Sequence, residues 1–288
     1  MVRPIVIGAH PKRDDRSPLE LGVTLSRLTG APLQVVGSYW FDSTPGRTAQ
    51  IDYGRELERK VRHAVARVLG AGDLDSPVDV RVTCGSPAHA LQQTATELGA
   101  GMIVVGSTHR GAFGRMATGT TAERVLDGAP CPVAVAPSGL DRTWGQAGEV
   151  GVAFVDTPGG WSALRAGAAM ARGMGAQLAV YTVTDAQTDD SDQRRAEDTL
   201  ERAIAEVAGD LGGEARILEG GAPALIKASK SLDLLVRGCR SPGVLRRPLS
   251  RELPGKLAGQ LGCPLVVVGP GKELPLVSMF DAEAALPA

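Results

Sequence analysis

Short apolar runs alternate with longer amphipathic segments along the whole chain. In the first half, runs rich in Val, Ile and Leu are separated by segments whose apolar residues recur at helical spacing. Strands that alternate with helices predict a parallel, doubly wound α/β sheet, because each helix carries the chain back across the sheet. The expected strands of the first half are Pro4–Ala9, Leu33–Gly37, Val78–Thr83, Met102–Val105 and Val133–Ala136.

The second half repeats this alternation. One intervening helix is clear from its spacing and is expected over Arg194–Gly209. The alternation therefore predicts a second five-stranded parallel sheet. Its strands are expected to start near Val150, Leu178, Ala215, Leu234 and Leu265.

The two halves are also related in sequence. The segment DGAPCPVAVAPSG returns later as GQLGCPLVVVGPG, and its Cys131 matches Cys263 at an offset of 263 − 131 = 132. The same offset, 238 − 106 = 132, pairs Gly106 with Gly238. Such internal similarity indicates two tandem domains of one fold. We expect domains at 1–138 and 148–271, a polar linker over Ser138–Glu149, and a tail at 272–288.

The order of the strands decides where a ligand would bind. If each domain has the order 3-2-1-4-5, the order reverses between the first and fourth strands, and ligands of such sheets bind there, beyond the carboxyl ends. In the first domain this places the turn at 8–11 beside the loop that follows Gly106. One pocket per domain is expected.

The segment MIVVGSTHRGAFGRMATGTTAERVL begins as a buried strand and ends as a helix. Thr120 and Glu123 have the spacing of a capping box at the helix start, and Gly119 stands directly before it. Free backbone N–H groups and the helix dipole favour an anion at such a position, and a glycine lets a ligand come close. The alternative is an ordinary capped helix after a glycine-rich loop.

This region resembles the signature of universal stress proteins, and the duplication is similar to their tandem members, with an adenine nucleotide alpha hydrolase-like fold. In ATP-binding members the motif is G-x-x-G, nine residues, then G-[ST]. Gly106, Gly119 and Thr120 fit it, whereas His109 replaces the second glycine and His10 replaces an aspartate after the first strand. The resemblance implies a site for ATP or another adenine nucleotide, with Mg²⁺ only as the companion of ATP. The implied site residues are Ala9, His10, Val36, Gly106, Ser107, His109, Gly119, Thr120 and Thr121.

His10 and His109 would lie at one mouth of the first domain. They would hydrogen-bond a phosphate when protonated, share a metal ion, or stack on a base, each in a pH-dependent way. The alternative is a pair of solvated loop histidines, and two ligands alone make a poor metal site. No metal site and no catalytic residue is expected.

The second domain departs further from the motif. Asp156 and Gly238 are retained, but Ser241 replaces the second glycine, and Arg251 and Glu252 occupy the places of Gly119 and Thr120. A carboxylate beside a phosphate repels it, so we expect weak or no triphosphate binding there. Arg251 would at most hold an anion from the side. The alternative role of this domain is packing against its twin.

Composition and charge limit the classes of partner and the compartment that we expect for this protein. The chain has 288 residues, 43% hydrophobic and 22% charged, and a formal charge of 31 − 32 = −1. Without a long Lys/Arg block we expect no nucleic-acid partner, and without a long apolar stretch no membrane span. Four cysteines without CxxC spacing suit a reducing compartment, and a cytoplasmic location is expected. They are Cys84, Cys131, Cys239 and Cys263.

Three functions remain open. The first is a nucleotide-responsive regulator in the stress response, and the second is an interaction scaffold of the same fold that has lost its ligand. The third is a weak ATPase, although no GxSxG, HExxH or SGGxDS motif supports dedicated enzyme chemistry. The fifth strands are long apolar edges, so we expect them to pair, either between the two halves as a pseudo-dimer or between two chains. The protein partner stays unidentified.

Overall fold

The computed structural model describes residues 2–10, 15–39, 47–69, 77–107, 120–140, 148–184, 190–239 and 260–269. In these ranges the strands form one sheet in the order β3-β2-β1-β4-β5-β10-β9-β6-β7-β8. The first-half strands are β1 (Ile5–Ala9), β2 (Leu33–Tyr39), β3 (Val78–Cys84), β4 (Met102–Gly106) and β5 (Val133–Ala136). The second-half strands are β6 (Glu149–Ala153), β7 (Gln177–Thr184), β8 (Glu214–Glu219), β9 (Leu234–Gly238) and β10 (Leu265–Val268).

Each half has the strand order 3-2-1-4-5. In the first half β1 pairs in parallel with both β2 and β4, which confirms the fold predicted from the alternation of strands and helices. In the second half β6 pairs in parallel with both β7 and β9 in the same way. The order therefore reverses beside β1 in one half and beside β6 in the other.

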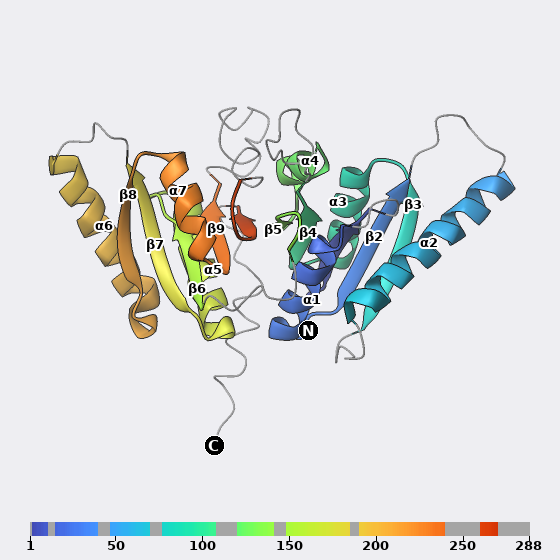
Figure 1. The fold of residues 1–288 in the computed structure, drawn as a ribbon, viewed down its shortest axis with the longest axis horizontal. Coiled ribbons are helices and arrows are strands. Elements are labelled where there is room, and N and C mark those ends of the chain that lie inside the picture. The colour runs from blue at the N-terminus through green and yellow to red at the C-terminus, as the bar shows by residue number, and fades with distance from the viewer. Residues whose placement is uncertain are drawn as a thin grey trace, which may run out of the picture.

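The two halves meet at their fifth strands. β5 and β10 pair antiparallel, with Ala134 opposite Val266, and this ladder makes the two five-stranded sheets continuous. Figure 1 shows the halves side by side with the β5–β10 seam at the centre. The sequence left open whether these apolar edges pair between the two halves or between two chains, and in the structure they pair between the two halves of one chain. Both edges are thereby covered without a second copy.

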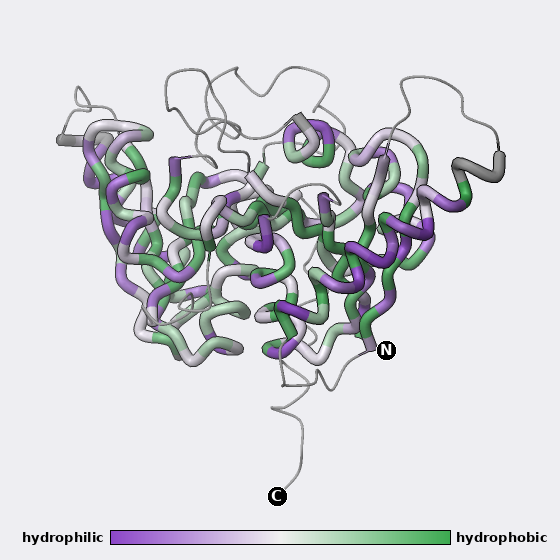
Figure 2. Tube along the Cα trace, turned by 45° about the vertical axis from the view of Figure 1, so that its right-hand side comes forward, coloured by the Kyte–Doolittle hydropathy of each residue, from purple (hydrophilic) through white to green (hydrophobic). Residues whose placement is uncertain are grey.

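Helices cover both faces of the sheet. One hydrophobic cluster packs α1, α2, α5 and α6 against one face, and a second packs α3, α4 and α7 against the other. Figure 2 shows hydrophilic stretches on the outer helices and hydrophobic ones along the strands. The helices are α1 (Ser17–Thr29), α2 (Arg47–Leu69), α3 (Pro87–Leu98), α4 (Thr120–Gly128), α5 (Pro158–Met174), α6 (Asp190–Ala208) and α7 (Ala222–Ala228). A short 3-10 turn follows α6 at Gly209–Leu211, and another follows α7 at Ser229–Ser231.

Local sequence explains where corresponding helices begin and end. α1 and α5 carry a proline within their first two positions, Pro18 and Pro158, where the missing N–H is not needed. Both end at a glycine with positive φ, Gly30 at 65° and Gly175 at 61°. The two halves therefore build this helix with the same start and stop signals.

None of the helices in the described ranges is both long enough and apolar enough to cross a bilayer.

Candidate functional site

The strand order reverses between β1 and β4, and their carboxyl ends form the candidate site. Ile7 of β1 lies opposite Val104 of β4, and continuing this register brings Ala9 level with Gly106. His10 follows Ala9 and is exposed. The structure thus brings Ala9, His10, Gly106 and the adjacent Ser107 to one edge of the sheet. Parallel sheets of this kind bind ligands at such an edge.

Gly106 is closely approached by the start of α1. A Cβ placed on Gly106 would lie 2.9 Å from Pro18 Cγ and 3.3 Å from Asp15 Oδ2. The first distance is shorter than real Cβ contacts, so a larger residue would have to displace Pro18. A glycine here lets the first turn of α1 and the end of β4 come together.

Asp15 is a candidate site residue that the sequence pattern did not indicate. Its Oδ1 accepts the Ser17 backbone N–H at 3.1 Å, which holds the start of α1. Its Oδ2 lies beside Gly106. One carboxylate therefore serves both the helix start and the candidate site.

The two halves place an aspartate at the same distance from this helix. Asp15 stands two residues before Ser17, where α1 begins, and Asp156 stands two residues before Pro158, where α5 begins. The connection from β1 to α1 has 7 residues and that from β6 to α5 has 4, so the first is 7 − 4 = 3 residues longer. The two helices end at Gly30 and Gly175, an offset of 175 − 30 = 145, and α5 is the longer, with 17 residues against 13. The two aspartates therefore share only their distance from the start of the helix.

Ser107 is buried, with 4% of its surface exposed. Its backbone N–H donates to Ala136 O at 2.8 Å, and its hydroxyl oxygen accepts the Ser138 N–H at 3.0 Å. The neighbouring Ser17 hydroxyl oxygen accepts the N–H groups of Gly139 at 3.0 Å and Leu140 at 3.2 Å. Two hydroxyls at the candidate site therefore hold the turn that follows β5.

α4 lies above the carboxyl ends of β4 and β5 (Figure 1). The side chains of Ala122 and Val125, both on α4, are fully buried. The Gln92 side chain of α3 donates to the carbonyls of Arg124 at 2.8 Å and Val125 at 3.4 Å, near the end of α4. These two hydrogen bonds hold α4 against α3.

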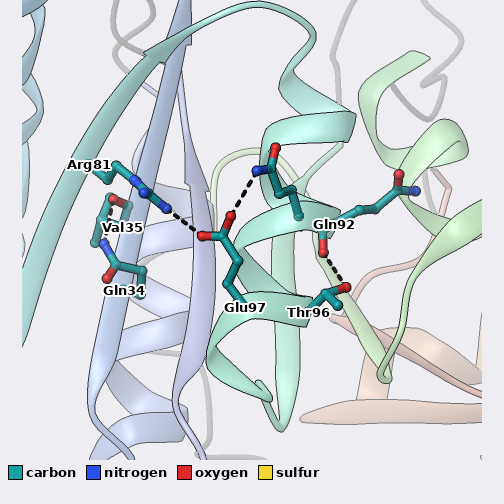
Figure 3. Close-up of polar contacts among 7 residues, drawn as sticks. Gln34, Val35, Arg81, Gln92, Thr96 and Glu97 are labelled. Carbon is teal, nitrogen blue, oxygen red and sulfur yellow. Dashed lines mark hydrogen bonds and ion pairs between the residues drawn. The ribbon is translucent and has the colours of Figure 1, made fainter.

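α3 is itself attached to the edge strand β3. Glu97 accepts a hydrogen bond from Arg81 of β3 at 2.8 Å and another from Gln93 at 2.8 Å. Figure 3 shows Glu97 pointing toward Arg81, and the Thr96 hydroxyl donating to the Gln92 carbonyl on the same helix. α3 thus links β3 to the helix above the candidate site.

The other residues implied by the motif divide into two groups. α4 begins at Thr120, and Thr121 is half-buried in its first turn. Val36 lies opposite Gly8 in β2 and is buried in the cluster that contains Leu91 of α3, so its side chain is covered by the protein. His109, Gly119 and the side chain of Thr120 lie outside the described residues.

The corresponding edge of the second half is packed differently. The Trp161 indole N–H donates to Asp156 Oδ1 at 2.8 Å, and the Trp161 ring meets Phe154 edge to face with centroids 5.4 Å apart. A Cβ on Gly238 would overlap the Gly159 carbonyl. The aspartate of this half therefore holds a tryptophan, and two backbone segments touch where Pro18 stands in the first half. Ser241, Arg251 and Glu252 lie outside the described residues.

Within the described ranges, no group of three or more His, Cys, Asp or Glu side chains is arranged to hold a metal ion. The arrangement of the first-half edge instead offers hydrogen-bond acceptors from Asp15 and a hydroxyl from Ser107.

Comparison with known proteins agrees with this architecture. Residues 1–137 match the model of the universal stress protein family. The chain is similar to a universal stress protein from Archaeoglobus fulgidus DSM 4304, with 16% identity and a TM-score of 0.68 over 93% of this chain and 97% of that one. No curated protein matches the sequence.

Two further structures illustrate the range of similarity. A protein of unknown function from Pseudomonas aeruginosa PAO1 has 17% identity and a TM-score of 0.60, over 99% of this chain and 98% of that one. A shorter universal stress protein from Archaeoglobus fulgidus, in complex with dAMP, has 21% identity and a TM-score of 0.35 over 47% of this chain and 99% of that one. At 16% and 17% identity, the similarity to the two structures that cover nearly the whole chain shows the fold alone.

Proposed function

Because residues 1–137 match the model of the universal stress protein family, we propose that this chain is a regulatory protein of the stress response that binds ATP or a related adenine nucleotide in its first half. Nucleotide binding would change how the protein meets a protein partner in the cytoplasm. Mg²⁺ would accompany ATP, and any hydrolysis would be slow and incidental.

The observation that carries this proposal is the close approach of Asp15 and Pro18 to Gly106 at the point of strand reversal. The edge combines a carboxylate, a buried hydroxyl and the start of a helix above the sheet. A carboxylate accepts hydrogen bonds from hydroxyl groups, so Asp15 suits the ribose of a nucleotide. Ser107 and the first turn of α4 supply donors, which suit its phosphates.

In this proposal Asp15 takes the part that the motif alone assigns to the residue after β1. Asp15 and Asp156 each stand two residues before a helix, α1 and α5. In the second half the Asp156 carboxylate accepts a hydrogen bond from Trp161. We therefore propose nucleotide binding for the first half only.

The experiment begins with protein purified without added nucleotide, which is denatured so that any released nucleotide can be identified by mass. ATP is then titrated by calorimetry at pH 6 and pH 8, with and without Mg²⁺. We expect micromolar binding that Gly119→Asp and Thr120→Ala abolish. Asp15→Asn should weaken binding about tenfold, as expected for a lost hydrogen bond to a charged group.

Asp156→Asn is the matched control, because it makes the same chemical change two residues before α5 in the second half. It should leave ATP affinity unchanged. Equal losses in Asp15→Asn and Asp156→Asn would contradict a site confined to the first half. A turnover assay in the same buffer distinguishes a binder from an ATPase.

A second candidate function is an interaction scaffold that binds no nucleotide. The Asp156–Trp161 hydrogen bond favours it for the second half, because there the carboxylate is used to pack an aromatic ring. If no nucleotide is released and no heat of binding is measured at either pH, the scaffold becomes the better description of both halves.

A further inference from the structure

The linker between the two halves is held at both ends by side-chain oxygens. At its start, the Gly139 N–H donates to the buried Ser17 hydroxyl at 3.0 Å. At its end, the Gly148 N–H donates to Asp233 Oδ2 at 2.7 Å, and Asp233 is only 3% exposed. Both glycines have positive φ, 84° and 72°. The chain between them is therefore fastened to each half at a defined point.

Each end of the linker also lies next to a fourth strand. Ser107 directly follows β4, the fourth strand of the first half, and its hydroxyl holds Ser138. Asp233 directly precedes β9, the fourth strand of the second half, and its N–H donates to Glu149 O at 2.9 Å. The two described ends of the linker thus lie at the candidate site and at the start of β9.

The first fastening is a tight turn. The Leu140 N–H donates to Pro137 O at 3.3 Å, and Gly139 has a φ of 84°. A four-residue turn with a left-handed glycine at its third position is of type II. Ser138 is then the second residue of the turn, a position at which proline is favoured.

The hydrogen bond from Ser138 determines what the Ser107 hydroxyl offers to a ligand. A serine hydroxyl has one proton to donate and accepts through its oxygen lone pairs. Because the oxygen of Ser107 accepts the Ser138 N–H at 3.0 Å, its proton is directed away from the turn. An anion that accepts this proton would polarise the hydroxyl and strengthen its bond to Ser138.

We propose that the turn at 137–140 couples the first-half site to the linker, with Ser107 as the shared group that donates to a ligand phosphate and accepts from Ser138. This inference rests on the proposed nucleotide binding. Occupancy of the site tightens the turn, and the turn presents the Ser107 proton to the ligand.

The test compares Ser138→Pro with Ser138→Ala in the full chain. Proline removes the N–H that bonds Ser107 and fits the second position of the turn, whereas alanine removes only the side chain and keeps the N–H. Calorimetry with ATP and amide hydrogen exchange at Gly139 and Leu140 are measured for both variants and for the unsubstituted chain. Exchange reports the opening of the turn in each state.

We expect ATP to slow exchange at Gly139 and Leu140 at least about threefold in the unsubstituted chain and in Ser138→Ala, and to leave it unchanged in Ser138→Pro. Ser138→Pro should also bind ATP roughly three- to tenfold more weakly than Ser138→Ala, as for one lost hydrogen bond.

The outcomes separate the two proposals. If the unsubstituted chain binds ATP but exchange at both amides is unaffected, or if the two variants bind ATP equally, the coupling is wrong and nucleotide binding stands. If the unsubstituted chain binds no ATP, the proposed function fails and the coupling fails with it.

Discussion

Asp15 and Gly106 face one another at the carboxyl edge of the sheet, where Asp15 Oδ2 lies 3.3 Å from the position of a Cβ on Gly106. The contact joins the residue that holds the start of α1 to the end of β4. The site therefore depends on how closely a helix and a strand from different parts of the chain approach.

Gly106→Ala should destabilise the protein. The added methyl group would lie 2.9 Å from Pro18 Cγ, so the first turn of α1 must move, at a cost of about 1–3 kcal/mol in the free energy of unfolding. Urea unfolding followed by circular dichroism measures it. Gly209→Ala is the control, since a Cβ there meets nothing within 4 Å, and it should cost little. Equal stabilities of the two variants would show that the approach of α1 to β4 is not tight.

The four cysteines should differ sharply in their reaction with a thiol reagent. Cys84 is exposed, whereas Cys131 and Cys263 are buried, and burial raises the pKa of Cys263 to about 12. The thiolate is the reacting form, so Cys263 has almost none at neutral pH. In a Cys239→Ser background we expect one thiol to react promptly with Ellman's reagent and two more only after unfolding. Adding Cys84→Ser should remove the prompt reaction, and its survival would contradict the assignment.

Asp127→Asn should stabilise the protein near neutral pH. Burial, and then repulsion from Glu123, raise the pKa of Asp127 above its ordinary value of 3.8. A raised pKa in the folded state favours the protonated form, so the contribution of Asp127 to stability is fully present below pH 3.8 and is lost as pH rises through the folded-state pKa. Asp127 also lies in the last turn of α4, where the helix dipole disfavours a negative charge.

Thermal unfolding of the unsubstituted chain and of Asp127→Asn, measured from pH 3.5 to 7, tests this. The difference in thermal stability between the variant and the unsubstituted chain should grow, in favour of the variant, as pH rises. A difference in stability that does not change with pH would refute the raised pKa.

Cysteines at 134 and 266 should join the two halves covalently. Ala134 and Val266 lie directly opposite one another in the antiparallel β5–β10 ladder, and such residues are close enough for a disulfide. In a background without Cys84 and Cys239, oxidised Ala134→Cys/Val266→Cys should stay in one piece after cleavage at a protease site engineered into 141–147. Ala134→Cys alone is the control and should separate under denaturing conditions. Disulfide-linked dimers in place of the internal bridge would indicate pairing between chains.

Much of the fold follows from local pattern. The strand expected over Val133–Ala136 has those limits in the structure, and the starts expected at Val150 and Leu178 differ by one residue from β6 and β7. The helix expected from Arg194 begins earlier, at Asp190, because a polar first turn carries no hydrophobic periodicity. Strands and helices are visible in this way because side-chain burial repeats at short range along each element.

The sequence by itself determined the alternation of elements, the internal repeat, and the edge of the sheet at which Ala9, Gly106 and Ser107 meet. Only the tertiary structure decided that β5 pairs with β10 in the same chain, that Asp15 lies beside Gly106, and that Ser17 holds Gly139, 122 residues away. The physical reason is that hydrophobic periodicity reports on neighbours within one element, whereas strand pairing and hydrogen bonds between distant segments are fixed when the elements pack.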